Sequence, residues 1–231
     1  KRLDLREEAS EKFMPFAHHV YENFIEGRHH RIIAKKLERV ARGELKRLII
    51  NMQPRHSKSE FASYLMPAWF LGRNPKLKII QATHNTELAV RFGRKVRDLI
   101  DDPQYKDIFP DTNLKEDNKG AGKWQTDKGG EYFAAGVGAA VTGRGADLFI
   151  IDDPHSEQDA LSESAFDNAY EWYTSGPRQR LQPGGSIILV MTRWGKKDLT
   201  GRLIAAQGGD VMADQWEIVE FPAIMPSDKP L

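Results

Sequence analysis

The stretch LIINMQPRHSKS, residues Leu48 to Ser59, decides how the rest of the chain is interpreted. Its apolar start predicts a strand, and a polar loop then leads through Lys58 and Ser59 into a helix with an apolar stripe. A strand, a short loop and a helix start form an anion site, because main-chain N–H groups point into the loop and the helix N-terminus is partly positive. The stretch therefore predicts a phosphate-binding loop.

This loop fits the pattern G-x-x-x-x-G-K-[ST] at its last two positions only. Lys58 is expected to neutralise phosphate charge and Ser59 to hold Mg²⁺, whereas Met52 and Ser57 stand where glycine is usual. Glycine is preferred because the backbone there takes a positive φ and approaches phosphate closely. The alternative is an ordinary helix that begins at a Lys-Ser pair. The predicted nucleotide-binding residues are Gln53, Pro54, Arg55, His56, Ser57, Lys58 and Ser59.

Composition places the chain among ordinary globular proteins. It has 231 residues, of which 40% are hydrophobic and 29% charged, and its formal net charge is +1, so any basic surface must be local. The sequence has no cysteine, which excludes disulfides, thiolate metal sites and a cysteine nucleophile. No apolar run is long enough to span a membrane, so we expect a cytoplasmic protein without a membrane partner.

Continuous apolar runs alternate with helical stripes along the chain. Because such runs fit strands that are buried on both faces, they predict an α/β fold with a mainly parallel central sheet flanked by helices. The predicted strands lie at 48–50, 78–83, 131–135, 147–151, 186–191 and 216–221.

Outside these strands, the sequence predicts two N-terminal helices, an irregular polar region and a tight turn. The spacing of Phe16, Val20 and Phe24 predicts one helix that ends at Gly27, and a second helix follows. Residues 101–128 are polar and predict an irregular excursion with short elements. The sequence Pro183-Gly184-Gly185 predicts a tight turn before the strand at 186–191.

Polar residues also follow two other predicted strands, and parallel strands would bring them to the edge that holds the loop. Asp152 ends an apolar run, and we expect it to hold Mg²⁺ across from Ser59. Asp153 stands where a general base would polarise the attacking water, although glutamate is common there. The alternative is that Asp152 only caps the turn before Pro154. Thr192 ends another strand and offers a hydroxyl near the γ-phosphate.

An arginine is expected to stabilise charge on the γ-phosphate in the transition state. Arg144 lies between two glycines just before the Asp152 strand, and it fits a finger donated to a neighbouring subunit. Arg55, inside the loop, is the competing candidate within the same chain. The alternative for Arg144 is a surface arginine in a flexible loop.

Four blocks in this order resemble the ATPase domain of the large terminase subunit of tailed bacteriophages. They are LIINMQPRHSKS, KIIQATHNTELAVRFGRKVRDLI, TGRGADLFIIDDP and GGSIILVMTRWGKKDLTGRL. The resemblance implies an additional-strand P-loop ATPase that uses ATP and Mg²⁺ to drive double-stranded DNA into the prohead. It also implies a homo-oligomeric ring, commonly a pentamer, on the portal protein, a small terminase subunit as partner, and a location in the host cell cytoplasm.

The resemblance also assigns roles and boundaries. Arg55, Lys58 and Ser59 fall in the Walker A motif, Asp152 and Asp153 in Walker B, Thr192 in the coupling motif, and Arg144 in the region of a trans-acting finger. We expect an N-terminal helical region at 1–45, an ATPase core at 46–222, and the start of a linker at 223–231 to an absent nuclease domain, hence no nuclease activity. Two alternatives stay open, namely a helicase-like P-loop ATPase and a degenerate nucleotide-binding, ring-forming module with little hydrolysis.

Overall fold

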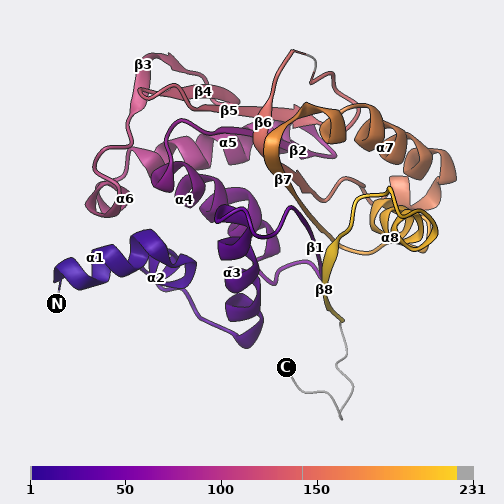
Figure 1. Ribbon diagram of the computed structural model, residues 1–231, viewed down its shortest axis with the longest axis horizontal. Coiled ribbons are helices and arrows are strands. Elements are labelled where there is room, and N and C mark those ends of the chain that lie inside the picture. The colour runs from indigo at the N-terminus through magenta and orange to yellow at the C-terminus, as the bar shows by residue number, and fades with distance from the viewer. Residues whose placement is uncertain (1, 142, 223–231) are drawn as a thin grey trace.

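One mainly parallel sheet forms the centre of the computed structural model, which describes residues 2–141 and 143–222 (Figure 1). Its eight strands lie in the order β3-β4-β5-β2-β6-β7-β1-β8, and β3 and β4 are antiparallel to their neighbours. The predicted α/β fold is confirmed. The strands are β1 (Arg47–Met52), β2 (Lys78–Thr83), β3 (Leu114–Lys119), β4 (Lys123–Thr126), β5 (Glu131–Gly136), β6 (Ala146–Asp152), β7 (Leu181–Met191) and β8 (Glu217–Phe221).

Helices cover both faces of this sheet. One face carries α1 (Arg2–Glu11), α2 (Phe13–Val20), α3 (Arg28–Ala41), the π-helix η1 (Glu60–Leu65), α4 (Met66–Arg73), α5 (Thr86–Ile100) and α6 (Pro103–Ile108). The other face carries α7 (Glu163–Ser175) and α8 (Leu199–Gly209), and the 3₁₀ turns η2 (Asp159–Leu161) and η3 (Pro177–Arg180) flank α7. None of the helices among the described residues is long and apolar enough to cross a membrane.

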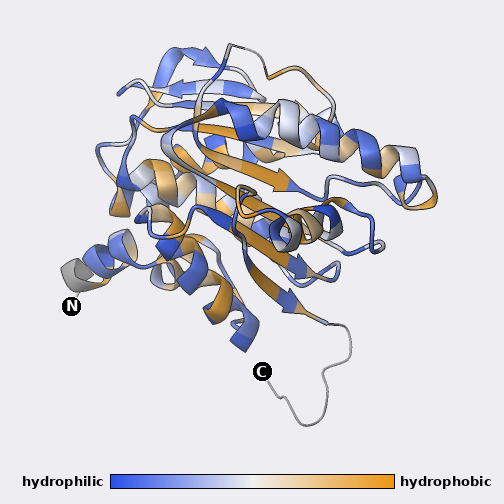
Figure 2. Cartoon of the chain, turned by 45° about the vertical axis from the view of Figure 1, so that its right-hand side comes forward, coloured by the Kyte–Doolittle hydropathy of each residue, from blue (hydrophilic) through white to orange (hydrophobic). Residues whose placement is uncertain are grey.

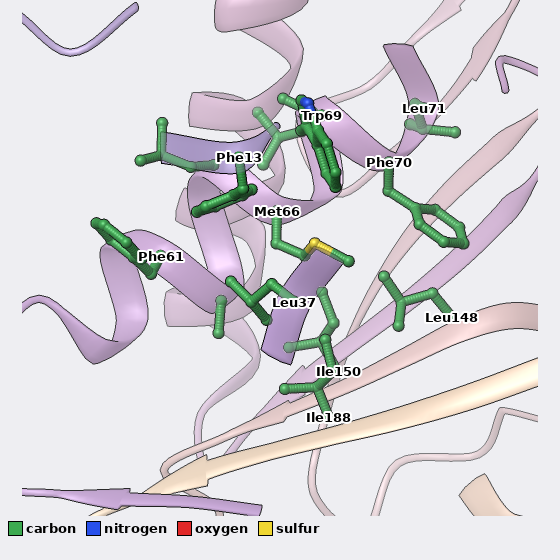
Figure 3. Packing of buried hydrophobic residues seen from close by; sticks show 14 of the residues in the cluster. Phe13, Leu37, Phe61, Met66, Trp69, Phe70, Leu71, Leu148, Ile150 and Ile188 are labelled. Atoms are coloured by element: carbon green, nitrogen blue, oxygen red, sulfur yellow. The ribbon is translucent and has the colours of Figure 1, made fainter. Parts of the chain in front are cut away.

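Successive residues of each central strand enter two different cores, because side chains alternate across a strand. In β6, Leu148 and Ile150 pack with the larger helical layer, whereas Phe149 and Ile151 pack with α7 and α8. Figure 2 shows the apolar strands enclosed between helices with polar outer faces. Figure 3 shows Phe13, Met66 and Trp69 gathered against the strand residues Leu148, Ile150 and Ile188. Burial on both faces explains why these strands read as continuous apolar runs.

The strand order defines the type of P-loop fold. Strand β7 lies between β1, which precedes the predicted phosphate loop, and β6, which ends in Asp152. An extra strand inserted between these two is the arrangement that the additional-strand class requires. The predicted additional-strand architecture is therefore present in the sheet.

The N-terminal helix prediction was wrong in its boundaries. Helix α2 ends at Val20 rather than continuing to Gly27, and Asn23 takes a left-handed φ of 59° that no helix can accommodate. Gly27 is instead the N-cap residue just before α3, where its N–H donates to Nδ1 of His30 at 2.8 Å. Phe24 still packs against the core, so its apolar spacing reflected burial outside the helix rather than helical periodicity. The boundary predicted near residue 45 stays a prediction, and residues 223–231 lie outside the described part.

Two other segments also refine the predictions. The polar region 101–128 contains α6 and the antiparallel strands β3 and β4, which extend the sheet beyond β5. The prediction of a tight turn at Pro183-Gly184-Gly185 was wrong, because β7 runs from Leu181 through these residues. They form an irregularity in its pairing with β6, where Gly184 has a φ of 83°. A glycine that bulges a strand gives the same sequence signal as a glycine in a turn.

A buried imidazole makes the stability of the fold depend on pH. His30 is 5% exposed and stacks on Phe61 with a centroid separation of 4.9 Å. Burial, reinforced by the neighbouring His29, lowers the pKa of His30 to about 4. An unfolded histidine titrates near 6.5, so the unfolded chain binds the proton first as the pH falls. The contribution of His30 to the stability of the fold is therefore fully present above about pH 6.5 and declines as the pH falls toward 4.

We expect the free energy of unfolding to be lower at pH 5 than at pH 7.5, with His30 contributing about 1–2 kcal/mol of the difference. Urea titrations at the two pH values measure it. The variant His30→Phe keeps a ring at this position and removes the titrating group. It should lose the hydrogen bond from Gly27 but show a shallower pH dependence than the unmodified chain. An equal pH dependence in both proteins would contradict this assignment.

Candidate phosphate-binding and catalytic site

The carboxyl ends of β1, β6 and β7 bring the predicted site residues together. The strand register aligns Asp152 with Val190 of β7, and Met191 of β7 with Asn51 of β1. The loop, the acidic pair and Thr192 therefore leave the sheet at the same edge, as predicted from parallel strands. The contacts below show that their side chains also meet.

The two positions where glycine is missing differ in backbone conformation. Arg55 and Ser57 both have a left-handed φ of 66°, so the second glycine position does take the conformation expected of it. Met52, at the first position, is still part of β1 and is buried. Alternating left-handed residues turn successive N–H groups to one side, which makes a concave anion-binding backbone. The first N–H groups of the following helix add further donors without intrahelical partners.

Ser57 carries a conformational cost that can be measured. A non-glycine residue in the left-handed region is strained by about 1 kcal/mol or more, and glycine relieves part of this strain. We expect Ser57→Gly to raise the free energy of unfolding by up to about 1 kcal/mol relative to Ser57→Ala, which keeps the strain. Chemical denaturation of the two variants gives the comparison. If Ser57→Gly were no more stable than Ser57→Ala, the positive φ would be wrong.

The ammonium of Lys58 faces Asp153. Its Nζ lies 2.8 Å from Oδ2 of Asp153, and the lysine side chain is only 7% exposed. Oδ1 of Asp153 accepts a hydrogen bond from the main-chain N–H of Thr192 at 2.8 Å. The main-chain carbonyl of Asp153 accepts from the N–H of His84 at 3.2 Å. Asp153 thereby links the loop after β1 to the ends of β7 and β2, and it holds an unusual φ of 41°.

Asp152 sits deeper, against the helix that follows the loop. Its two carboxylate oxygens accept hydrogen bonds from Ser59 at 2.9 Å and from Ser63 at 2.7 Å. Burial, helped by the negative charge of Asp153, raises the pKa of the Asp152 carboxyl above its usual range, although the two hydroxyls and Lys58 act in the opposite direction. The Ser59 hydroxyl and the Asp152 carboxylate form an all-oxygen donor pair of the kind that Mg²⁺ prefers. These residues fit the ion predicted for them.

The two candidate arginines lie in different places. Arg144 pairs with Glu131 and stacks on Phe133 with its guanidinium carbon 3.9 Å from the ring centroid. Glu131 begins β5, so Arg144 lies at the amino edge of the sheet, opposite the loop. The structure therefore does not bring Arg144 to the site of its own chain, and its role toward a neighbouring subunit stays a prediction. Arg55 is exposed within the loop itself.

Thr192 and the remaining residues of the predicted phosphate loop lie close to the strand ends. The hydroxyl of Thr192 donates to the main-chain carbonyl of Met52 at 3.4 Å, which ties β7 to the start of the loop. Gln53 and Thr192 line the same cavity of about 140 Å³. Pro54 and His56 are exposed, and the carbonyl of Pro54 lies 2.9 Å from Nδ1 of His56. No contact in the described residues tests the predicted role of these side chains toward a ligand.

Sequence reasoning missed several residues of this site. Ser63 lies four residues after Ser59, so helical spacing alone places both hydroxyls on one face. His84 follows the end of β2, and the strand-end rule that selected Asp152 also selects it. Asp198 and His155 are buried beside the same edge, but nothing in the local sequence distinguishes them from surface residues.

Comparison with known proteins supports the fold. No protein-family model and no curated protein matches the sequence. Among solved structures, the large terminase of bacteriophage HK97 is similar, with a TM-score of 0.52 and 14% sequence identity. The match covers 90% of this chain and 41% of that protein, so the chain spans less than half its length. At this identity the likeness concerns the fold alone.

Proposed function

We propose that this chain is the ATPase part of a phage DNA-packaging motor, which hydrolyses ATP with Mg²⁺ to move double-stranded DNA into a prohead. The observation that carries the proposal is the meeting of Lys58 with Asp153 and of Ser59 with Asp152 at one sheet edge. A buried cation, a hydroxyl–carboxylate pair and a second carboxylate are the groups that phosphoryl transfer to water requires. The similarity to a large terminase supports the packaging role.

The residues divide the chemistry among them. Lys58 and the loop N–H groups are suited to bind and orient the phosphates, and Ser59 with Asp152 would hold Mg²⁺, which when bound neutralises phosphate charge. Asp153 is suited to accept a proton from the attacking water once Lys58 turns to the phosphate. In the full assembly we expect a homo-oligomeric ring on a portal protein, a small terminase subunit as partner, and action in the host cytoplasm.

A second candidate is a degenerate nucleotide-binding module that scarcely hydrolyses. The observation that favours it is that Asp153 already forms an ion pair with Lys58, while Ser57 is strained. Steady-state phosphate release from ATP, with Mg²⁺ or with EDTA, separates the candidates when nucleotide binding is titrated in parallel. Mg²⁺-dependent release supports the motor ATPase. Tight binding without release at any protein concentration supports the degenerate module.

A further inference from the structure

The first turn of α8 is buried where the strands of the site end. Asp198, Leu199 and Thr200 are each fully inaccessible to solvent, although two of them are polar. Burying a polar group costs free energy unless the group is hydrogen-bonded, so the polar groups of this turn need hydrogen-bond partners. Those partners belong to the ends of β1, β6 and β7.

The contact with β1 comes from Thr200. Its hydroxyl donates to Oδ1 of Asn51 at 3.1 Å, and Asn51 lies two residues before the predicted phosphate-binding residues begin. The Nδ2 atom of Asn51 is buried and has no partner among the described residues. Asn51 also lines the cavity that Gln53 and Thr192 line. The Thr200 hydroxyl is therefore the side-chain contact that fixes the Asn51 amide.

The contact with β6 comes through His155, two residues after Asp153. The N–H of Leu199 donates to Nε2 of His155 at 3.0 Å, and His155 is 3% exposed. Burial lowers the pKa of His155, which keeps the ring neutral. Because Nε2 accepts, the ring proton of the neutral imidazole is on Nδ1. The segment that carries Asp153 is thus attached to the helix start by a buried bond.

The contact with β7 uses the carboxylate of Asp198. It accepts from Nε of Arg193 at 2.9 Å, from the N–H of Trp194 at 2.9 Å and from the N–H of Gly195 at 3.2 Å. It also caps its own helix through the N–H of Gly201 at 2.9 Å. The loop after Thr192 is therefore bonded to the start of α8 through one carboxylate, and Thr192 itself is bonded to Asp153.

We propose that this first turn couples the three strand ends of the site, and that Thr200 and His155 are positioning residues for hydrolysis. The inference rests on the proposed ATPase function. A nucleotide that draws Lys58 away from Asp153 changes the contacts of Asp153, and two routes lead from there to α8. One runs through Thr192 and the loop after it to Asp198, and the other runs through His155 to Leu199. The Asn51 contact closes the connection back to the loop, so the position of Asp153 relative to the loop depends on α8. An ion pair between Arg202 and Asp167 continues the connection to α7.

The test compares Thr200→Val, which keeps the shape and removes the hydroxyl, with Thr200→Ser, which keeps the hydroxyl. We expect Thr200→Val to lower kcat for ATP hydrolysis about tenfold while KM and the Kd for a non-hydrolysable ATP analogue change less than twofold. Thr200→Ser should stay within twofold of the unmodified kcat. An unchanged kcat in Thr200→Val, equal losses in both variants, or a parallel loss of analogue affinity would each overturn the proposal.

A measurement on the unmodified chain does not depend on the folding of any variant. Hydrogen exchange of the amides in residues 192–204 should slow at least twofold when the analogue and Mg²⁺ are added. Unchanged exchange with bound analogue would overturn the coupling even while the ATPase proposal stands. If the unmodified chain neither binds nor hydrolyses ATP, the proposed function fails, and the positioning roles fail with it.

Discussion

Replacing Lys58 by alanine should lower the rate of Mg²⁺-dependent ATP hydrolysis at least about 100-fold. Lys58 is buried and is the cation that the loop after β1 presents toward the acidic pair. A buried ammonium attracts phosphate charge in surroundings that screen charges little. Its loss therefore weakens the binding of both the substrate and the transition state. We therefore expect weaker nucleotide binding together with slower turnover. Phosphate release and titration with a fluorescent ATP analogue measure the two effects.

The matched control is Lys76→Ala. Lys76 is an exposed lysine just before β2, at the opposite edge of the sheet, and its removal should leave both rate and affinity within twofold. Thermal unfolding of both variants shows whether they are folded, since Lys58→Ala also leaves Asp153 without its partner. A normal rate in folded Lys58→Ala, or equal losses in the two variants, would contradict the assignment of the loop.

The core of the fold was predictable because its strands are buried on both faces. Such strands leave an uninterrupted apolar run in the sequence, as in Leu148 to Ile151, and parallel strands place their carboxyl ends together without further information. The edge of the sheet was harder to predict. Strand β3, with the sequence LKEDNK, is exposed along most of its length, and no apolar pattern marks it as a strand. Its pairing with β4 comes from the tertiary structure.

The residues of the site also differ in how far the sequence alone predicts their positions. Lys58, Ser59, Asp152 and Asp153 were found because each follows a buried strand or begins a helix. The pairing of Lys58 with Asp153, however, joins residues 95 positions apart in sequence (153 − 58), and it depends on a left-handed backbone at Asp153 that no local pattern predicts. Arg144 shows the converse case. Its glycine neighbours indicated mobility, but its place against Glu131 follows from the path of the loop back to the amino edge.

Asp153→Asn should separate turnover from binding. Asparagine keeps an oxygen that accepts the N–H of Thr192, so the strand end is expected to hold its position. It is neither a proton acceptor nor a counter-ion, however, and a lost general base lowers kcat by about 10²–10⁴-fold. Lys58 loses its carboxylate partner at the same time. Nucleotide affinity should therefore stay equal or increase, because the lysine no longer exchanges one anion for another.

We thus expect Asp153→Asn to lower kcat without lowering nucleotide affinity. Lys58→Ala, in contrast, should lower both. Asp147→Asn is the matched control. Asp147 accepts the N–H of Lys78 at 2.7 Å near the amino edge, so its variant should hydrolyse ATP at the unmodified rate. If affinity fell in step with the rate in Asp153→Asn, Asp153 would belong to the nucleotide-binding groups rather than to the base. The ion pair with Lys58 would then hold the loop open for phosphate rather than compete with it.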